Sequence, residues 1–354
     1  GGGFVGRVVQ QRAKGFSLSP QDGVNAEKIK KIQKLADFEN PEYPESIRQV
    51  DWVALAQGNS ALLKSKPSNP QLCFKNKIAL VTGAGGGLGR AYAHVLAKLG
   101  AHVIVNDMGK DGSGRIFADL VVEEVKRAGG CASANYHNVL EAEAMAQEII
   151  TKHGAIHILI NNAGILRDKS FLKMTPKEWF DVLDVHLNGT FRVTKAFLPV
   201  FMKQKYGRIL NTTSAVGLYG NYGQANYSSA KAGIISFSKS LSQECSKHNI
   251  LVNCIAPNAG TSMTATVLPK DIVDLLKPDF VAPFAAALCH ADSTVTGRVF
   301  EVGSGWISEV RWERSPWAPV NNDDLPATFK NTTTHKGATY PQNATTSFIE
   351  IQQL

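Results

Sequence analysis

The chain has 354 residues, 44% of them hydrophobic and 19% charged, which excludes the disordered and fibrous classes of protein. This length predicts two domains or one large domain with extensions, and no apolar run approaches the roughly 18 to 20 residues of a transmembrane helix. The formal net charge is +8, but the basic residues form neither an aromatic-lined patch nor a known motif, so nucleic acid is not an expected partner.

The N-terminal part of the chain differs in composition from the rest. Residues 1–15 carry a glycine-rich stretch that aligns with Gly303–Arg314, and this similarity predicts the tail of a preceding, related domain, with chance as the alternative. Residues 16–70 are rich in Ser, Pro, Asn and Lys and include one helical pattern, Ala26–Phe38. We expect this part to be a linker with a short helix.

Short β-branched runs alternate with helical patterns between residues 71 and 315. The predicted strands are Ile78–Thr82, His102–Asn106, Ala132–Asn135, His157–Asn161, Arg208–Thr212, Leu251–Ile255 and Arg298–Val302. The predicted helices cover about 88–99, 116–128, 140–153, 176–203 and 224–247. Apolar strands separated by helices indicate a parallel sheet covered on both faces, so the predicted fold class is α/β, doubly wound and Rossmann-type. It forms a single catalytic domain with extended flanks. Residues 316–354, rich in Pro, Asn and Thr, are expected to be poorly ordered.

The cysteines give no sign of a disulfide framework. Cys73, Cys131, Cys245, Cys254 and Cys289 are scattered and include no CxxC pair. An odd, unclustered set argues against disulfides and against a zinc site, so we expect a reducing compartment and no bound metal.

A glycine-rich turn follows the first predicted strand and begins the first predicted helix. Thr82–Gly89 reads TGAGGGLG, which fits the pattern TGxxxGxG and not GxGxxG. Glycines let the backbone turn tightly and approach a pyrophosphate, and the amides of a helix N-terminus favour such an anion. We therefore expect Gly83, Gly87, Leu88 and Gly89 to bind a dinucleotide, a purely structural turn being the alternative.

Asp107 stands at the end of the second predicted strand, one helix and one strand beyond the glycine-rich turn. A carboxylate there can accept hydrogen bonds from both adenosine ribose hydroxyls and would repel a 2′-phosphate. This predicts NAD as the cofactor. NADP is the alternative, because Arg90 or Lys110 could accommodate the phosphate.

Tyr227 and Lys231 stand at positions i and i+4 of a predicted helix and therefore share one face of it. A nearby cation lowers the pKa of a phenol, which would bring Tyr227 toward the range of efficient acid–base catalysis. Ser214 precedes Tyr227 in the chain and comes just after a strand, where its hydroxyl could bond the reacting oxygen. Taken singly, the Tyr/Lys pair is a common chance pattern and Ser214 a common turn residue.

Four motifs in this order resemble the short-chain dehydrogenase/reductase family over about residues 74–310: TGAGGGLG, Asn161-Asn162-Ala163-Gly164, Ser214, and Tyr227 with Lys231. The resemblance implies that Tyr227 is the general acid/base, that Ser214 steadies the substrate and that Lys231 also binds the nicotinamide ribose. It further implies cofactor contacts from Asn138, Val139, Asn162, Pro257, Ala259, Gly260 and Thr261.

Two positions depart from the family pattern. The asparagine that supports the lysine is replaced by His186, which makes His186 a candidate catalytic residue and leaves open whether it relays a proton. The usual Pro-Gly after the late strand reads Pro257-Asn258-Ala259-Gly260.

Further segments resemble the dehydrogenase part of the peroxisomal multifunctional enzyme type 2 group, including Asn161–Asp168, Tyr219–Tyr227, Arg311–Arg314 and His186 itself. This resemblance, strongest for fungal versions with two tandem dehydrogenase domains, implies oxidation of (3R)-hydroxyacyl-CoA in β-oxidation. It also implies a peroxisomal location, a homodimer and a longer multidomain chain in which this is the second dehydrogenase domain. The chain ends Gln352-Gln353-Leu354, which is not a Ser-Lys-Leu address. The alternatives are a reductase of another ketone, such as a steroid or an acyl-carrier substrate, and a non-catalytic domain of an assembly.

Overall fold

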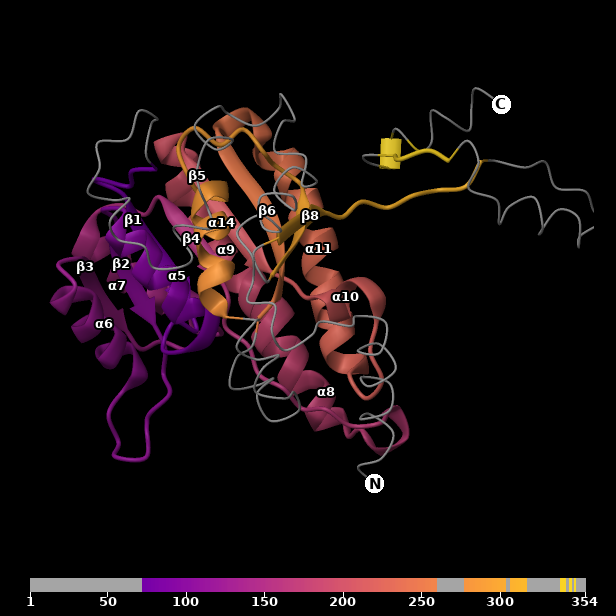
Figure 1. Cartoon of the computed structure of the whole chain (residues 1–354), viewed down its shortest axis with the longest axis horizontal. Helices are drawn as coiled ribbons and strands as arrows, with labels where there is room; N and C mark the ends of the chain where they lie inside the picture. Colours follow the sequence, from indigo (N-terminus) through magenta and orange to yellow (C-terminus); the bar gives the residue numbers. More distant parts are fainter. Residues whose placement is uncertain are drawn as a thin grey trace, which may run out of the picture.

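The computed structural model describes residues 72–259, 277–303, 306–316 and 338–341, together with 344–345 and 347. Its centre is an eight-stranded sheet with the order β3-β2-β1-β4-β5-β6-β7-β8 (Figure 1). The strands are β1 (Ile78–Thr82), β2 (His102–Asn106), β3 (Cys131–Asn135), β4 (Ile158–Asn161), β5 (Gly207–Thr212), β6 (Ile250–Asn258), β7 (Val299–Gly303) and β8 (Trp306–Glu309).

The first seven strands are parallel, as the apolar runs predicted. Most of their side chains are buried, except in the edge strand β3, where Cys131 is exposed. The last strand, β8, was not predicted and pairs with β7 in the antiparallel direction. Its sequence, WISE, is too short to give a clear periodic pattern. The predicted doubly wound α/β class is confirmed, with one antiparallel strand added at its edge.

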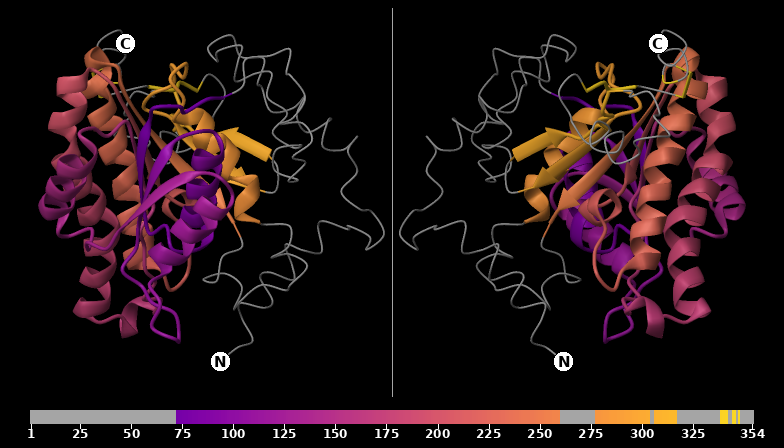
Figure 2. Two further views of the ribbon diagram at one scale, coloured as in Figure 1. Left: turned by 90° about the vertical axis from the view of Figure 1, so that its left-hand side faces the viewer. Right: turned by 90° about the vertical axis from the view of Figure 1, so that its right-hand side faces the viewer.

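Helices cover both faces of the sheet (Figure 2). The helices are α5 (Gly87–Lys98), α6 (Phe117–Arg127), α7 (Ala142–His153), α8 (Pro176–Leu183), α9 (Gly189–Gln204), α10 (Ala215–Tyr219), α11 (Ala225–Cys245) and α14 (Ala282–Leu288). One hydrophobic core lies between the sheet and α5, α6 and α14, and a second between the sheet and α7, α9 and α11. The short α10 and the all-apolar α14 were not predicted.

The predicted helix over 176–203 is divided into three parts. A capping box starts α8, because Thr175 accepts a hydrogen bond from the backbone amide of Glu178 and the Glu178 carboxylate accepts one from Thr175. A π-helical turn, Asp184–Asn188, then separates α8 from α9. Such turns insert one extra residue and are frequent at functional sites.

The strand order reverses beside β1, which lies between β2 and β4. In doubly wound sheets the connections diverge at such a point and leave a crevice beyond the carboxyl ends of the strands. The glycine-rich turn follows β1 and Asn162 follows β4, so the predicted cofactor residues meet there.

Within the described part of the chain, no helix is both long and apolar enough to cross a bilayer. The predicted tail at 1–15 and the linker at 16–70 lie outside the described residues, as does most of 316–354. Within the last segment, Thr339 exchanges two backbone hydrogen bonds of 2.9 Å with Arg314. The predicted domain boundaries stay predictions.

Candidate active site

The turn between β1 and α5 forms a tight cradle. Gly83 has a φ of +62°, and a Cβ atom at this position would lie 2.7 Å from the Cα of Ala163. A Cβ at Gly89 would overlap the Gly83 carbonyl oxygen and lie 2.7 Å from Asn162 Nδ2. Only glycine fits at both positions, so the backbone of this turn can close against the turn that follows β4.

The cradle is open on the side of the helix N-terminus. Gly86 precedes α5 with no side-chain cap, and a Cβ there would meet nothing within 4 Å. Gly87 has a φ of +50°, while Leu88 packs against the core. The first amides of this 12-residue helix therefore face a space that an anion can enter.

Asn162, which follows β4, is hydrogen-bonded to the glycine-rich turn. Its side-chain amide donates to the carbonyl oxygens of Thr82 and Gly83, both at 3.1 Å. The Thr82 hydroxyl accepts in return from the backbone amides of Asn162 (3.0 Å) and Ala163 (3.1 Å). Thr82 was not predicted as a site residue, although its place at the end of the strand was visible.

Asp107 lies at the carboxyl end of β2, beside the glycine-rich turn. One carboxylate oxygen accepts from the Gly85 amide (2.9 Å) and the other from the Gly109 amide (2.8 Å). A carboxylate has about four acceptor positions, so both oxygens can still accept hydroxyl groups. Arg90, named above as a possible phosphate ligand, is instead paired with Glu124 at 2.7 Å.

The remaining predicted cofactor residues are spread around the same edge of the sheet. Asn138 accepts a hydrogen bond from the Leu140 amide, and Val139 is buried where Gly189 begins α9. Pro257 lies in β6 and Ala259 directly follows it. The last two predicted positions, Gly260 and Thr261, lie outside the described residues.

Ser214 and Tyr227 come from two helices that follow β5. Ser214 caps α10, and its hydroxyl accepts a hydrogen bond from the Val216 amide at 3.1 Å. Tyr227 lies in the first turn of α11, and its phenol is near enough to the Ser214 hydroxyl for that hydroxyl to lower the pKa of the phenol. The structure therefore brings together two hydroxyl groups that stand well apart in the sequence.

Lys231 is buried one helical turn beyond Tyr227. Its ammonium nitrogen donates to the Thr212 carbonyl oxygen at 2.6 Å and lies 5.6 Å from the centre of the Tyr227 ring. The Thr213 hydroxyl donates to the Lys231 carbonyl at 2.8 Å. Gly217 makes this packing possible, since a Cβ there would lie 2.6 Å from Lys231 Cβ. Neither Thr212 nor Gly217 was predicted, because only the folded chain reveals such contacts.

The pKa values of the pair differ from the expectation. Burial lowers the pKa of Lys231 to about 7. Burial also raises the pKa of Tyr227 above 10.0, a change that its bond to Ser214 opposes and that the charge of Asp168 reinforces. The expectation that Lys231 lowers the pKa of this phenol is therefore wrong for the chain alone, because desolvation disfavours both charged forms.

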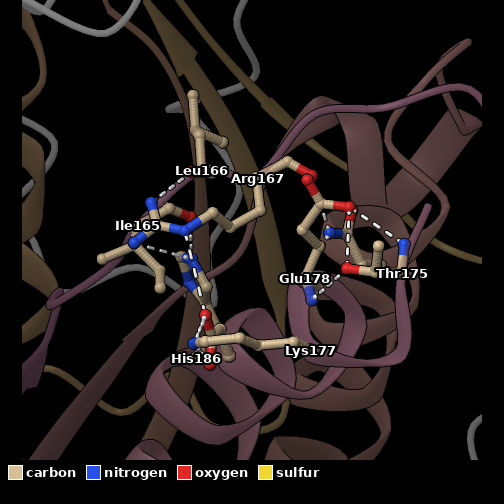
Figure 3. Close-up of polar contacts among 9 residues, drawn as sticks. Ile165, Leu166, Arg167, Thr175, Lys177, Glu178 and His186 are labelled. Atoms are coloured by element: carbon tan, nitrogen blue, oxygen red, sulfur yellow. Dashed lines mark hydrogen bonds and ion pairs between the residues drawn. The ribbon is translucent and has the colours of Figure 1, made fainter. Parts of the chain in front are cut away.

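His186 lies in the π-helical turn, with 3% of its surface exposed. Its Nε2 atom is 3.0 Å from the Ile165 amide nitrogen and 2.8 Å from the Ile165 carbonyl oxygen (Figure 3). Its ring meets the Tyr227 ring edge to face, with centroids 5.1 Å apart. All four predicted catalytic residues thus belong to one cluster.

A sequence model described as short chain dehydrogenase matches residues 77–271, more than half of the chain. The chain belongs to the short chain dehydrogenase family. This dehydrogenase is 45% identical over 320 residues to a peroxisomal hydratase-dehydrogenase-epimerase of Neurospora crassa, a match that covers 89% of this chain and 34% of that protein. It is 51% identical over 261 residues to a peroxisomal multifunctional enzyme type 2 of Mus musculus, covering 73% of this chain and 36% of that one.

A solved structure has the same fold. The full-length peroxisomal multifunctional enzyme type 2 of Drosophila melanogaster aligns with 80% of this dehydrogenase and 50% of its own chain, at 36% identity and a TM-score of 0.68. The chain spans only about a third of the length of the two curated relatives above.

Dehydrogenases of this family use NAD or NADP. The residues present fit such a dinucleotide on two observations. The glycine cradle leaves the α5 N-terminus open, and the half-buried Asp107 lies beside it with acceptor positions to spare. Among the described residues, no group of three or more His, Cys, Asp or Glu side chains is arranged to hold a metal ion.

Proposed function

We propose that this dehydrogenase oxidises (3R)-3-hydroxyacyl-CoA to the 3-ketoacyl-CoA in fatty-acid β-oxidation, with NAD as the hydride acceptor. The observation that carries the proposal is the cluster of Ser214, Tyr227 and Lys231 beside the glycine cradle. The names of the relatives include a dehydrogenase and a peroxisomal location, and the resemblance supplies the pathway, the substrate and its R configuration.

Tyr227 accepts the proton of the substrate hydroxyl in this proposal, and Ser214 bonds the same oxygen. A proton transfer needs the phenol within hydrogen-bond reach of the substrate oxygen, and the nearness of the Ser214 hydroxyl to the Tyr227 phenol supports one oxygen bonded by both groups. When bound, NAD would accept the hydride from C3. Lys231 is buried and Tyr227 is partly buried, so proton transfer would take place in a site with restricted water.

Two electrostatic features support NAD rather than NADP as the cofactor. Asp107 would repel a 2′-phosphate, and the pairing of Arg90 with Glu124 removes one cation that could bind it. The residues proposed to hold NAD are Gly83, Gly87, Leu88, Gly89, Asp107, Asn138, Val139, Asn162, Tyr227, Lys231, Pro257, Ala259, Gly260 and Thr261.

The setting is also a proposal drawn from the relatives. We propose that the chain lies in the peroxisome and is one part of a longer multifunctional protein, as the names of the relatives suggest. By the family resemblance we also propose that it forms a homodimer and is the second of two tandem dehydrogenase domains.

The test is NAD reduction, followed by absorbance, with (3R)- and (3S)-hydroxyacyl-CoA of matched length. We expect turnover of the R form only, and greater activity with NAD than with NADP. Parallel assays with a steroid alcohol and a hydroxyacyl-carrier substrate test the neighbouring specificities. Preferred turnover of either, or binding of NADH with no turnover at all, would overturn the proposed substrate.

A further inference from the structure

His186 contacts three separate parts of the candidate site. Its Nε2 atom lies against both backbone groups of Ile165, just beyond the turn after β4. Its ring meets the Tyr227 ring at 89°. A Cβ at Gly164 would overlap the Cε1 atom of His186 and lie 3.1 Å from both ring nitrogens, so glycine is needed where this turn crosses the imidazole.

The hydrogen bonding of the imidazole favours the neutral form. A ring nitrogen either accepts or donates, so Nε2 bonds either the Ile165 amide or the Ile165 carbonyl oxygen. The other nitrogen, Nδ1, is buried and has no partner among the described residues. A charged ring would bury a second N–H donor there without an acceptor. Burial, reinforced by the Lys231 charge, accordingly lowers the pKa of His186 to about 3.

The position of His186 in the π-helical turn directs it at the site. The turn joins α8 to α9 without breaking the helical path, and the extra residue alters which side chains face α11. His186 is buried toward Tyr227, while Asn188 in the same turn is exposed and donates to Asp184 at 2.7 Å. Within one turn, the His186 side chain therefore contacts the candidate site, while the Asn188 side chain lies at the surface.

We propose that His186 is a positioning residue whose neutral imidazole fixes the plane of the Tyr227 ring against the Ile165 backbone and so holds the phenol beside Ser214. Only the expected change in kcat rests on the proposed function. It differs from a proton relay, in which the imidazole would gain and lose a proton during turnover.

Two substitutions separate the ring from its hydrogen bond. His186→Phe keeps an aromatic edge for Tyr227 and removes Nε2, whereas His186→Gln keeps a polar group and removes the ring. We expect kcat to fall about 10-fold to 100-fold in His186→Gln and less in His186→Phe. KM and the NADH dissociation constant, measured by fluorescence, should change less than threefold. The matched control, Asn188→Ala, alters the same turn and should keep the wild-type kcat.

Two measurements do not depend on turnover. In ¹⁵N spectra, the His186 signal, assigned by its loss in His186→Gln, should stay that of a neutral ring from pH 5 to 9. With ring-labelled tyrosine, the Tyr227 signal, assigned with Tyr227→Phe, should shift in His186→Gln and not in Asn188→Ala.

Titration of the His186 ring between pH 5 and 9 would overturn the inference in favour of a relay. An unmoved Tyr227 signal, or a wild-type kcat in both His186 variants, would overturn it in favour of a merely structural role. If the wild type turns over no hydroxyacyl-CoA, the proposed function fails, while the two spectroscopic measurements still decide the role of His186.

Discussion

The ammonium of Lys231 donates to the Thr212 carbonyl oxygen across 2.6 Å, inside a site that leaves 3% of this lysine exposed. The bond joins α11 to the end of β5, the strand that leads to Ser214. A cation held this way fixes α11 against the end of β5, two residues before Ser214. It also carries the cost of burying a charge, which the hydrogen bond offsets only in part.

Lys231→Met should therefore abolish turnover and stabilise the fold. The folded pKa is about 7 against 10.5 for a free lysine, so between these values the unfolded chain binds the extra proton. The cost of burial is thus complete below pH 7 and disappears as the pH rises to about 10.5. We expect the variant to gain about 2 kcal/mol at pH 6.5, less than the full pKa difference because the Thr212 carbonyl loses its donor. Urea unfolding at pH 6.5 and 10 measures this gain, and a variant less stable at pH 6.5 would contradict it.

Tyr227→Phe removes the phenol but keeps the ring that packs against His186. Turnover should fall by at least about 10³-fold, because the variant loses the proposed general base. NADH binding, followed by fluorescence, should change less than threefold. Ser214→Ala is the companion variant and should reduce kcat less, since it leaves the base in place. Residual turnover in Tyr227→Phe above that of Ser214→Ala would remove Tyr227 from its proposed role.

Asp107→Asn should weaken the preference for NAD. The amide keeps one oxygen for the Gly85 or Gly109 amide but no longer repels a 2′-phosphate. Adding Glu124→Gln loosens Arg90 from its 2.7 Å ion pair and supplies a cation. We expect the ratio of kcat/KM for NAD over NADP to fall about 10-fold in the single variant and further in the double variant. Glu124→Gln alone should lower the ratio less than Asp107→Asn, because Asp107 still repels the 2′-phosphate.

The sequence predicted the parts of this fold that have strong local periodicity. The strands Ile78–Thr82 and His102–Asn106 were placed to the residue, because each is an apolar run bounded by turn residues. The π-helical turn was missed, since one inserted residue does not disturb an amphipathic pattern. The antiparallel β8 was missed because it is short and its pairing is a tertiary property.

In the candidate site, too, the sequence predicted what has a local signal and missed what depends on tertiary contacts. Tyr227 and Lys231 were visible as a spacing, and Ser214 as a hydroxyl after a strand. Gly217 could not be predicted, because a side chain is excluded there only by the contact between α10 and α11 in the folded chain. The pKa of Tyr227 was predicted in the wrong direction, because spacing reveals a neighbouring cation but not the burial that outweighs it.

Acid should destabilise the wild type more steeply than His186→Gln. The folded pKa of His186 is about 3 against 6.5 for a free histidine, so the unfolded chain binds the extra proton between these values. Stability is therefore lost as the pH falls from 6.5 toward 3, at about 1.4 kcal/mol per pH unit from this group. The difference in unfolding free energy between wild type and variant should shrink by that slope between pH 6 and 4. If the unfolding free energies of wild type and variant changed equally with pH over this range, His186 would not be held neutral.

A further contact that the sequence did not reveal joins three segments at the edge of the site. The Glu301 carboxylate accepts from the Tyr219 phenol at 3.0 Å and from the Asn258 side-chain amide at 2.8 Å. Tyr219 ends the helix that Ser214 begins, and Asn258 stands where the family pattern has glycine. Glu301 therefore ties α10 to the end of β6, where the proposed nicotinamide contacts begin.

Glu301→Gln should shift α10 relative to the end of β6. We expect kcat to fall about 3-fold to 10-fold with little change in the NADH dissociation constant, because small displacements affect reaction geometry more than binding. Tyr219→Phe and Asn258→Ala each remove one of the two bonds, and their combination should reproduce the effect of Glu301→Gln in a double-mutant cycle. Arg298→Lys, on the outer side of the same sheet edge and paired with Glu309 at 2.8 Å, is the control and should keep the wild-type kcat. If the Tyr219 and Asn258 effects simply add and Glu301→Gln keeps full activity, the carboxylate does not couple the two segments.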